Sequence, residues 1–216
     1  MSLEDRAALL GQRPATVWLT GLSGAGKSSL AFALEHHLTG KGHACFVLDG
    51  DNVRHGLNRD LGFSAEHRTE NIRRIAEVAR LMNDAGLVVF SAFISPYRAD
   101  RELARQIIGE DRFIEVYVAT PMVICEQRDV KGLYRRARSG EIADFTGISA
   151  PYEPPETPMA TIDTSLTTLD EYALRFDIEE NFLDDKSNGF QVEATHLNDA
   201  QAIARLFLVL APSTIS

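Results

Sequence analysis

Eight residues near the start of the chain carry its clearest chemical signal. Residues 21–28 read Gly-Leu-Ser-Gly-Ala-Gly-Lys-Ser and match G-x-x-x-x-G-K-[ST], the pattern of a loop whose backbone N–H groups surround nucleotide phosphates. In such a loop Lys27 is expected to reach the β- and γ-phosphates, and Ser28 to offer its hydroxyl to Mg²⁺. A β-rich run at residues 16–20 precedes the loop and a helical pattern follows it. The sequence therefore predicts a nucleoside triphosphate site.

This phosphate loop (residues 21–28) leaves the reaction itself open. It could serve a GTPase switch, an ATP-driven motor, a nucleotide kinase or a kinase of another small molecule. A GTPase would need the guanine-reading pattern N-K-x-D, which the sequence lacks. A motor or recombination ATPase would usually carry an acid at the end of a strand, and the apolar run at residues 87–93 ends without one. Both observations favour a kinase.

Two acidic residues, Asp49 and Asp51, follow a second apolar run at residues 44–48, which we expect to form a buried strand. In a tight Asp-Gly-Asp turn both carboxylates can face the phosphate loop. One could then hold Mg²⁺ through water while the other orients or deprotonates an acceptor hydroxyl. We assign the metal to Ser28 and Asp49, and we take Lys27, Asp49 and Asp51 as the candidate catalytic residues. The competing interpretation is that the two acids only form a turn, as Asp-Gly often does.

Alternating strand and helix patterns must position these groups. The β-rich runs fall at residues 16–20, 44–48, 87–93, 112–118 and 159–163. The helical patterns fall at residues 28–38, 66–85, 98–108 and from Pro121 onward. Such alternation predicts a three-layer α/β/α fold with a parallel central sheet. Because ligands bind at the carboxyl ends of parallel strands, the phosphate loop, the Asp49–Asn52 turn and residues 95–97 are expected along one edge.

Two segments lack a clear pattern. Residues 128–147 are basic and punctuated by glycine, and this cluster of positive charge is either an anion-binding segment or a solvated helix face. From residue 176 the sequence becomes acidic and weakly periodic. We therefore expect a catalytic domain at residues 1–175 and a C-terminal extension at residues 176–216 that ends in a helix capped by Asn198.

The bulk composition narrows the classes of function. A chain of 216 residues, 44% hydrophobic, can bury one good core. Its net charge of -9 argues against generic nucleic-acid binding. No run approaches the roughly 18 apolar residues of a membrane span, and the N-terminus lacks the design of a signal peptide, so we expect a cytoplasmic protein that binds no membrane. Cys45 and Cys125 lie far apart and are expected to be reduced thiols.

Four longer stretches are more specific than the phosphate loop. They read DGDNVRHGLN (49–58), ISPYR (94–98), EQRDVKGLYRRA (126–137) and FTGISAPYE (145–153). With the loop, they resemble the adenylylsulfate kinase family from about residue 13 to residue 163. The resemblance implies a P-loop NTPase-type fold with a mobile basic lid. It also implies transfer of the ATP γ-phosphate to the 3′-hydroxyl of adenosine 5′-phosphosulfate, which is the activation step of sulfate assimilation.

The resemblance assigns roles to individual residues. Those implied to bind ATP are Gly21, Ser23, Gly24, Ala25, Gly26, Lys27, Ser28, Ser29 and Arg128. Those implied to contact adenylylsulfate are Asp51, Asn52, Val53, Arg54, Phe63, Arg68, Thr69, Glu70, Asn71, Ile94, Ser95, Lys131, Asp144 and Phe145. In the family the positions of Phe63 and Phe145 sandwich the adenine. Arginine suits the sulfated phosphate because one guanidinium can bond two oxygens at once.

The resemblance further implies ATP and Mg²⁺ as cofactors and a homodimer as the assembly, and it leaves open an association or fusion with ATP sulfurylase. Some family accounts make the serine at the position of Ser95 a phosphorylated intermediate, but we expect it only to bind substrate because phosphoryl transfer needs mainly positioning and charge neutralisation. Two alternatives are another small-molecule or nucleotide kinase and a nonenzymatic regulatory domain. Intact Lys27, Ser28, Asp51 and Arg68 favour an enzyme.

Overall fold

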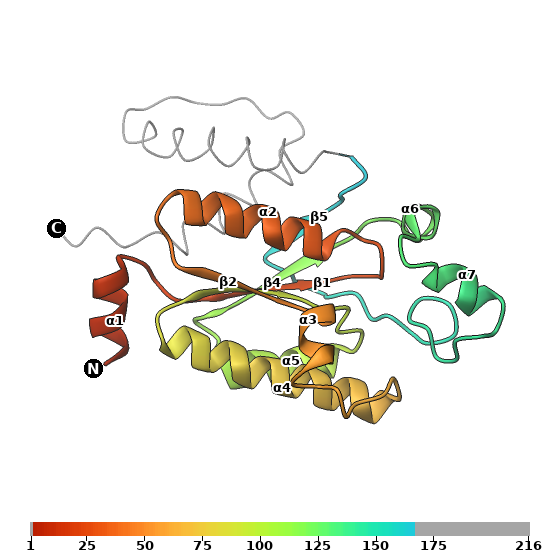
Figure 1. Cartoon of the computed structure of the whole chain (residues 1–216), viewed down its shortest axis with the longest axis horizontal. Coiled ribbons are helices and arrows are strands. Elements are labelled where there is room, and N and C mark those ends of the chain that lie inside the picture. Colours follow the sequence, from red (N-terminus) through yellow and green to blue (C-terminus); the bar gives the residue numbers. More distant parts are fainter. Residues whose placement is uncertain (1, 167–216) are drawn as a thin grey trace.

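In the computed structural model, which describes residues 2–166, a five-stranded sheet lies between two layers of helices (Figure 1). The strands are β1 (Thr16–Thr20), β2 (Cys45–Asp49), β3 (Val88–Ala92), β4 (Phe113–Val118) and β5 (Ala160–Ile162). They pair in the order β2-β3-β1-β4-β5, and every pair is parallel. The predicted three-layer fold with a parallel central sheet is confirmed, and the predicted strand positions hold to within one residue at each end.

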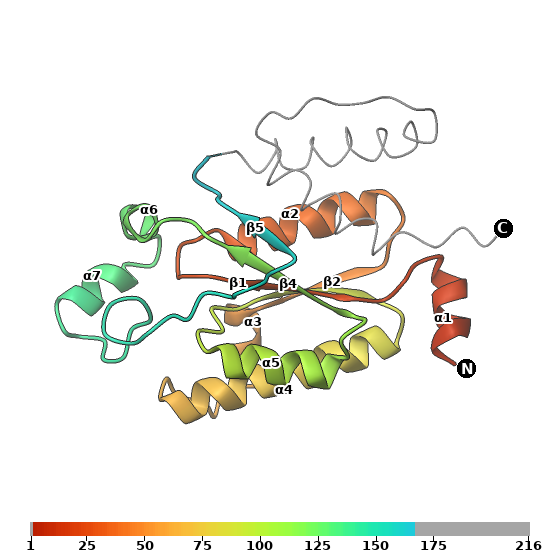
Figure 2. The same ribbon diagram turned by 180° about the vertical axis from the view of Figure 1, so that it is seen from behind.

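The helices cover both faces of this sheet. They are α1 (Leu3–Leu10), α2 (Lys27–Gly40), α3 (Gly50–His55), α4 (Ala65–Asp84), α5 (Arg98–Ile108), α6 (Met122–Arg128) and α7 (Leu133–Arg138). Both views place α2 on one face and the neighbouring pair α4 and α5 on the other (Figure 2). Helices α6 and α7 lie at the end of the molecule where α2 begins. Among residues 2–166 no helix is long and apolar enough to cross a membrane.

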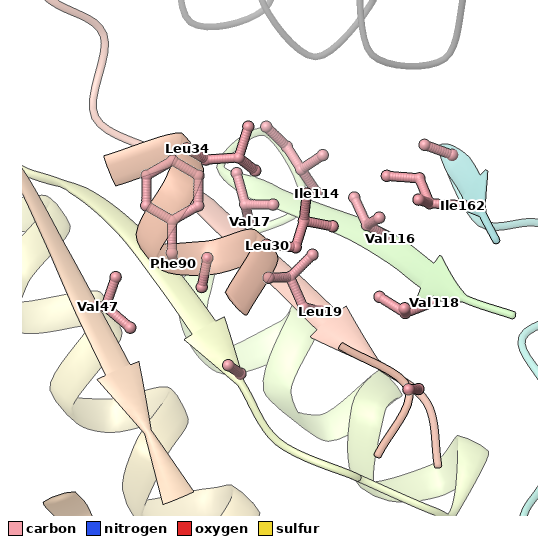
Figure 3. Close-up of a cluster of buried hydrophobic side chains, with 14 of the residues drawn as sticks. Val17, Leu19, Leu30, Leu34, Val47, Phe90, Ile114, Val116, Val118 and Ile162 are labelled. Atoms are coloured by element: carbon pink, nitrogen blue, oxygen red, sulfur yellow. The ribbon is translucent and has the colours of Figure 1, made fainter. Parts of the chain in front are cut away.

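Strand β1 lies in the middle of the sheet, and all five of its residues are buried. Because successive side chains of a strand point to opposite faces, its residues supply two cores. Val17 and Leu19 pack on the α2 side with Leu30 and Ile114, as Figure 3 shows. Trp18 faces the α4–α5 side. Each fully buried aliphatic side chain of this kind contributes about 1.5–3 kcal/mol to folding.

The second core lies between the sheet and α4. The Trp18 ring lies 5.7 Å from that of Phe113, and the α4 stripe of Ile72, Ile75 and Ala79 is buried against the same cluster. Helix α4 begins where the Ser64 side chain accepts a hydrogen bond from a backbone N–H of its first turn. The start of α4 therefore fixes the position of residues 68–71, which lie in its first turns.

Three expectations about local structure were wrong or incomplete. Residues 44–48 were expected to be a buried strand, but β2 lies at the edge of the sheet and Phe46 is 46% exposed. Helix α1 was not predicted, although Ser2 and Asp5 form a capping box at its start. Helix α7 lies in the basic segment, where the two flanking glycines and its short length hide the helical pattern. The predicted C-terminal extension and its final helix fall outside the described residues.

Candidate functional site

The phosphate loop depends on glycines that other side chains could not replace. Gly24 and Gly26 have φ values of 73° and 96°, in the left-handed region that favours glycine. At Gly21 an added Cβ would lie 2.4 Å from the Val118 carbonyl oxygen, and at Gly24 it would lie 2.9 Å from that of Cys125. Strand β4 and helix α6 therefore press directly on the loop backbone and hold its curvature.

Lys27 begins α2 and turns back into the loop. Its Nζ donates to the carbonyl oxygens of Gly21 (2.9 Å) and Leu22 (2.7 Å), and the side chain is buried. Burial lowers the pKa of Lys27 from 10.5 to about 8, while the neighbouring Cys125 and Asp49 act in the opposite direction. The ammonium group is thus enclosed by backbone oxygens. Negative phosphate oxygens would stabilise its charged form further.

Ser28 and Asp49 form the second element of the phosphate side. The Ser28 hydroxyl donates to a carboxylate oxygen of Asp49 at 2.5 Å, which joins the start of α2 to the end of β2. Among residues 2–166 no group of three or more His, Cys, Asp or Glu side chains could hold a metal. Mg²⁺ bound with a nucleotide needs only one or two protein oxygens besides phosphate and water. The hydroxyl–carboxylate pair fits that requirement.

The predicted Asp-Gly-Asp turn is instead the start of a helix. Strand β2 ends at Asp49 and α3 begins at Gly50, so Asp51 and Asn52 lie in a first helical turn at the carboxyl edge of the sheet. Val53 is buried in the core under α4, whereas Asn52 is exposed. The chain can start a helix directly here because parallel strands commonly lead into helices at this edge. Residues 49–52 still lie at the carboxyl edge of the sheet, as the sequence predicts.

An exposed aromatic ring lies beside two arginines on the substrate side. The Arg54 guanidinium stands 4.2 Å from the centre of the Phe63 ring, whose residue is 64% exposed. Burial, and then the positive charge of Arg68, lowers the pKa of Arg54. Two like charges held together next to an open ring form a local positive surface. An anion attached to an aromatic base has complementary chemistry.

Arg68 connects α4 to the end of the basic segment. Its Nε donates to the Phe63 carbonyl (2.9 Å), and its two terminal nitrogens donate to the Thr146 hydroxyl (2.6 Å) and to the Asp144 carbonyl. Asp144 has a φ of 54°, which turns the chain at this point. One guanidinium thus brings together segments that are nearly 80 residues apart in the sequence.

Phe63 and Phe145, predicted to sandwich an adenine, have opposite surroundings. Phe145 is only 8% exposed and belongs to the core on the α2 side. Its ring meets that of Tyr134 edge-on, with the centroids 5.1 Å apart. Arg68 binds carbonyl oxygens at Phe63 and at Asp144, directly beside Phe145, so both aromatics lie along the same stretch of the site.

The three residues after Arg68 bind other protein groups. Hydrogen bonds from Arg73 and then Arg74 hold the pKa of Glu70 at about 2. Asn71 is buried and accepts a hydrogen bond from the Asn58 amide at 2.9 Å. Thr69 bonds the Asp100 carboxylate, whose pKa is raised by burial. All three residues thus bond neighbouring protein groups, and their contact with adenylylsulfate stays a prediction.

Ile94 and Ser95 lie just past the end of β3, as predicted. The Ile94 carbonyl accepts from the Thr20 hydroxyl at 2.8 Å, and the Ser95 carbonyl accepts from Arg101 at 2.8 Å. The buried Ser95 hydroxyl lies 3.1 Å from the indole nitrogen of Trp18 and 3.4 Å from the Phe93 carbonyl. Neither group can deprotonate a serine, which favours binding over a nucleophilic role for Ser95.

The basic segment contains residues that touch the phosphate loop. Arg128 donates to the Gly24 carbonyl at 3.3 Å and to the Thr164 hydroxyl at 2.8 Å. Lys131 is exposed on the same segment. Arg128 thus lies beside the phosphate loop, and its role in binding ATP stays a prediction.

Three residues on the phosphate side were missed by sequence reasoning. Thr120 and Thr164 both donate to the Ala25 carbonyl, at 3.0 and 2.8 Å, and the Tyr134 hydroxyl donates to the Ser23 carbonyl at 2.9 Å. The two threonines lie two residues past the ends of β4 and β5, so the rule that ligands bind at the carboxyl ends of strands could have found them. For Tyr134, the sequence carries no such signal.

Comparison with known proteins agrees with this geometry. The model of the adenylylsulphate kinase family matches residues 13–163. An adenylyl-sulfate kinase of Shewanella amazonensis is 63% identical over 166 residues, which cover 77% of this chain and 84% of that protein. One from Phocaeicola vulgatus is 57% identical over 79% of this chain and 84% of that protein.

Two solved structures extend the likeness to three dimensions. The Mycobacterium tuberculosis APS kinase CysC in complex with AMPPNP and APS aligns with a TM-score of 0.72 at 49% identity, covering 78% of this chain and 98% of its own. The hexameric APS kinase from Thiobacillus denitrificans aligns with a TM-score of 0.58 at 32% identity, covering 88% of this chain and 32% of its own. The chain belongs to the adenylylsulfate kinase family.

Proposed function

We propose that this protein transfers the γ-phosphate of ATP to the 3′-hydroxyl of adenosine 5′-phosphosulfate. The products are ADP and 3′-phosphoadenylylsulfate, so the reaction activates sulfate for assimilation. The observation that carries the proposal is the juxtaposition at one sheet edge of a complete phosphate loop with the Arg54–Phe63–Arg68 surface. A loop alone fits many kinases, whereas an open aromatic ring with two arginines suits a nucleotide that carries extra negative charge.

On the ATP side, the loop N–H groups and the start of α2 would bind the phosphates. Lys27 would move its ammonium group from the Gly21 and Leu22 carbonyls to the γ-phosphate and stabilise the charge that develops there. Ser28 and Asp49 would hold Mg²⁺, which neutralises charge on the β- and γ-phosphates when bound. This side of the site therefore prepares the phosphoryl group for transfer.

On the acceptor side, Arg54 and Arg68 would bind the phosphosulfate and Phe63 would support the adenine face. Asp51, in the first turn of α3, would accept the proton of the 3′-hydroxyl or orient it. Direct in-line transfer between the two bound nucleotides needs no phosphorylated enzyme. We therefore give Ser95 a binding role only.

The test is release of ADP measured in a coupled assay, with and without adenylylsulfate. A panel of other acceptors would include AMP, which lacks the sulfate, and a sugar acid such as gluconate. We expect ADP release to require adenylylsulfate and to be far slower with AMP. Equal rates on gluconate, or ADP release that no acceptor stimulates, would contradict the proposal in favour of another kinase or a nucleotide-binding regulator.

We also infer a cytoplasmic homodimer, from the resemblance to the family. The solved relative from Thiobacillus denitrificans is hexameric, which supports self-association but leaves the number of copies to experiment. Light scattering on the full chain would give the mass, and a mass of one copy would contradict the dimer. An association with ATP sulfurylase stays a prediction that co-purification from the native cell can test.

A further inference from the structure

Tyr134 touches both halves of the site through one side chain. We propose that Tyr134 couples the binding of ATP to the binding of adenylylsulfate, as a positioning residue that contacts neither nucleotide. The inference rests on the proposed function, since it concerns the same two ligands. Tyr134 would link the conformation of the phosphate loop to that of the substrate surface.

The hydroxyl of Tyr134 forms a hydrogen bond with the phosphate loop. It donates to the Ser23 carbonyl at 2.9 Å, and the residue is only 1% exposed. Burial raises the pKa of Tyr134 above its ordinary value, so the hydroxyl keeps its proton and acts as a donor. Ser23 lies between the glycines of the loop, where the backbone must take one conformation to surround phosphate. The hydrogen bond is therefore sensitive to the conformation of the loop.

The ring of Tyr134 supports the substrate surface. It packs edge-on against Phe145 with the centroids 5.1 Å apart. The residues on either side of Phe145 accept hydrogen bonds from Arg68, through the Asp144 carbonyl and the Thr146 hydroxyl. A contact chain thus runs from Ser23 through Tyr134 and Phe145 to Arg68.

Tyr134 is also fixed within its own segment. The Asp129 carboxylate accepts hydrogen bonds from the backbone N–H groups of Tyr134 (3.0 Å) and Arg135 (3.1 Å) at the start of α7. A side chain held at its backbone, ring and hydroxyl cannot follow the loop without moving Phe145. The linkage is therefore mechanical, through packed atoms with few free rotations.

Coupling follows from the cost of ordering these groups. When ATP binds, the phosphate loop loses conformational freedom, and the hydrogen bond to the Ser23 carbonyl restricts Tyr134. The Tyr134 ring then restricts Phe145 and the neighbouring residues that Arg68 binds. Adenylylsulfate then meets a surface that is already ordered and loses less conformational entropy on binding. Because coupling free energies are reciprocal, adenylylsulfate must strengthen ATP binding by the same factor.

The experiment measures the affinity for adenylylsulfate by calorimetry, on the free enzyme and on enzyme saturated with a non-hydrolysable ATP analogue. The ratio of the two dissociation constants is the coupling factor. For the unaltered protein we expect at least about fivefold tighter binding in the presence of the analogue. Tyr134→Phe keeps the ring and removes only the hydroxyl, and it should lower the factor by about two- to tenfold, the worth of one hydrogen bond.

Tyr152→Phe is the matched control. It removes another, half-buried tyrosine hydroxyl, which lies 3.0 Å from the Thr20 hydroxyl, and the Tyr152 ring stacks on Tyr117 and not on Phe145. Its coupling factor should equal that of the unaltered protein. Phe145→Leu breaks the same contact chain at the ring and should lower the factor even if Tyr134→Phe folds poorly. Melting temperatures identify any variant that fails to fold.

Two results would overturn the inference. One is a coupling factor of one in the unaltered protein, and the other is a factor that Tyr134→Phe and Phe145→Leu leave unchanged. Failure of the proposed function would look different, because adenylylsulfate would then neither bind to the unaltered protein nor be phosphorylated by it. That outcome would remove the substrate on which the inference rests.

Discussion

The phosphate side and the substrate side of this site are built from different kinds of contact. On the phosphate side, glycine backbone geometry shapes the loop, and Lys27, Thr120 and Thr164 bind its carbonyl oxygens. On the substrate side, Arg54 packs on the exposed Phe63 ring, and Arg68 binds the carbonyl oxygens of Phe63 and of the distant Asp144. The first is a cradle of backbone groups, and the second is assembled from long side chains.

The difference indicates which side carries catalysis and which carries selectivity. Backbone dipoles need little reorganisation, so they can stabilise charge in the transition state together with the ammonium group that Lys27 would bring from the loop carbonyls. Arginines that already bind protein oxygens must exchange these bonds for bonds to a ligand, which favours a ligand of the right shape and charge. Mutations on the phosphate side should therefore act on turnover, and those on the substrate side on affinity for adenylylsulfate.

The largest effect is expected at the buried lysine. Lys27→Ala should lower kcat by about a thousandfold, because it removes the charge that stabilises the γ-phosphate. Its melting temperature should not fall, since the change relieves the burial of a charge. Lys41→Ala, an exposed lysine at the end of the same helix, is the matched control and should keep full activity. Near-normal turnover of Lys27→Ala would refute the catalytic role of the cradle.

The second-largest effect is expected at Asp51, and it distinguishes the role of this residue from that of Asp49. Asp51→Asn should lower kcat by about a hundredfold, the contribution of a group that handles the acceptor proton, and leave ATP affinity unchanged. Asp49→Asn should instead raise the Mg²⁺ concentration needed for half-maximal rate. Measuring kcat against Mg²⁺ concentration distinguishes them. If Asp51→Asn changes only the KM for adenylylsulfate, Asp51 is a binding residue.

Within the substrate side, substitutions of the exposed Phe63 and the buried Phe145 should differ in their effect on stability. Phe63→Ala should weaken adenylylsulfate binding by about 1–3 kcal/mol without loss of stability, because the ring is 64% exposed. Phe145→Ala should weaken it similarly but also lower the free energy of unfolding by about 3 kcal/mol or more, because Phe145 is buried against Tyr134. Denaturant unfolding and both nucleotide affinities test this pair. Equal stability of the two variants would contradict the assigned surroundings.

The smallest effect concerns the hydroxyl that Arg68 binds on the basic segment. Thr146→Val preserves the shape of the side chain and removes the acceptor at 2.6 Å. Because Arg68 keeps its bonds to two carbonyls, we expect a loss of about 1 kcal/mol in stability and a change of a few-fold in the KM for adenylylsulfate. ATP affinity measured by calorimetry should not change. A larger loss of ATP affinity would show that this contact supports the cradle as well.

The phosphate side could be predicted from the sequence because its information is local. The loop pattern spans eight consecutive residues, and the five strands show as short apolar runs between helical ones. The start of α3 at Gly50 was missed because Asp-Gly is also a common turn signal. The edge position of β2, with Phe46 exposed, depends on the order of strands and not on its own residues.

The substrate side could be predicted only through resemblance to a family. The contacts of Arg68 with Asp144 and Thr146 join residues that are 76 and 78 positions apart, and no spacing rule reports on them. The exposure of Phe63 and the burial of Phe145 are likewise set by tertiary packing, which two phenylalanines in similar loop sequences do not reveal. The sequence indicated which residue types form the site, and tertiary packing determines which of them are exposed.

The most direct test of the proposed reaction is to locate the transferred phosphate. Phosphorus NMR of the product from ATP and adenylylsulfate would show which oxygen of the acceptor carries it. The account predicts a phosphomonoester on the 3′-hydroxyl with the 5′-phosphosulfate intact, and no product from an adenylylsulfate analogue that lacks the 3′-hydroxyl. A phosphate on another position, or turnover of the 3′-deoxy analogue, would contradict the proposed function.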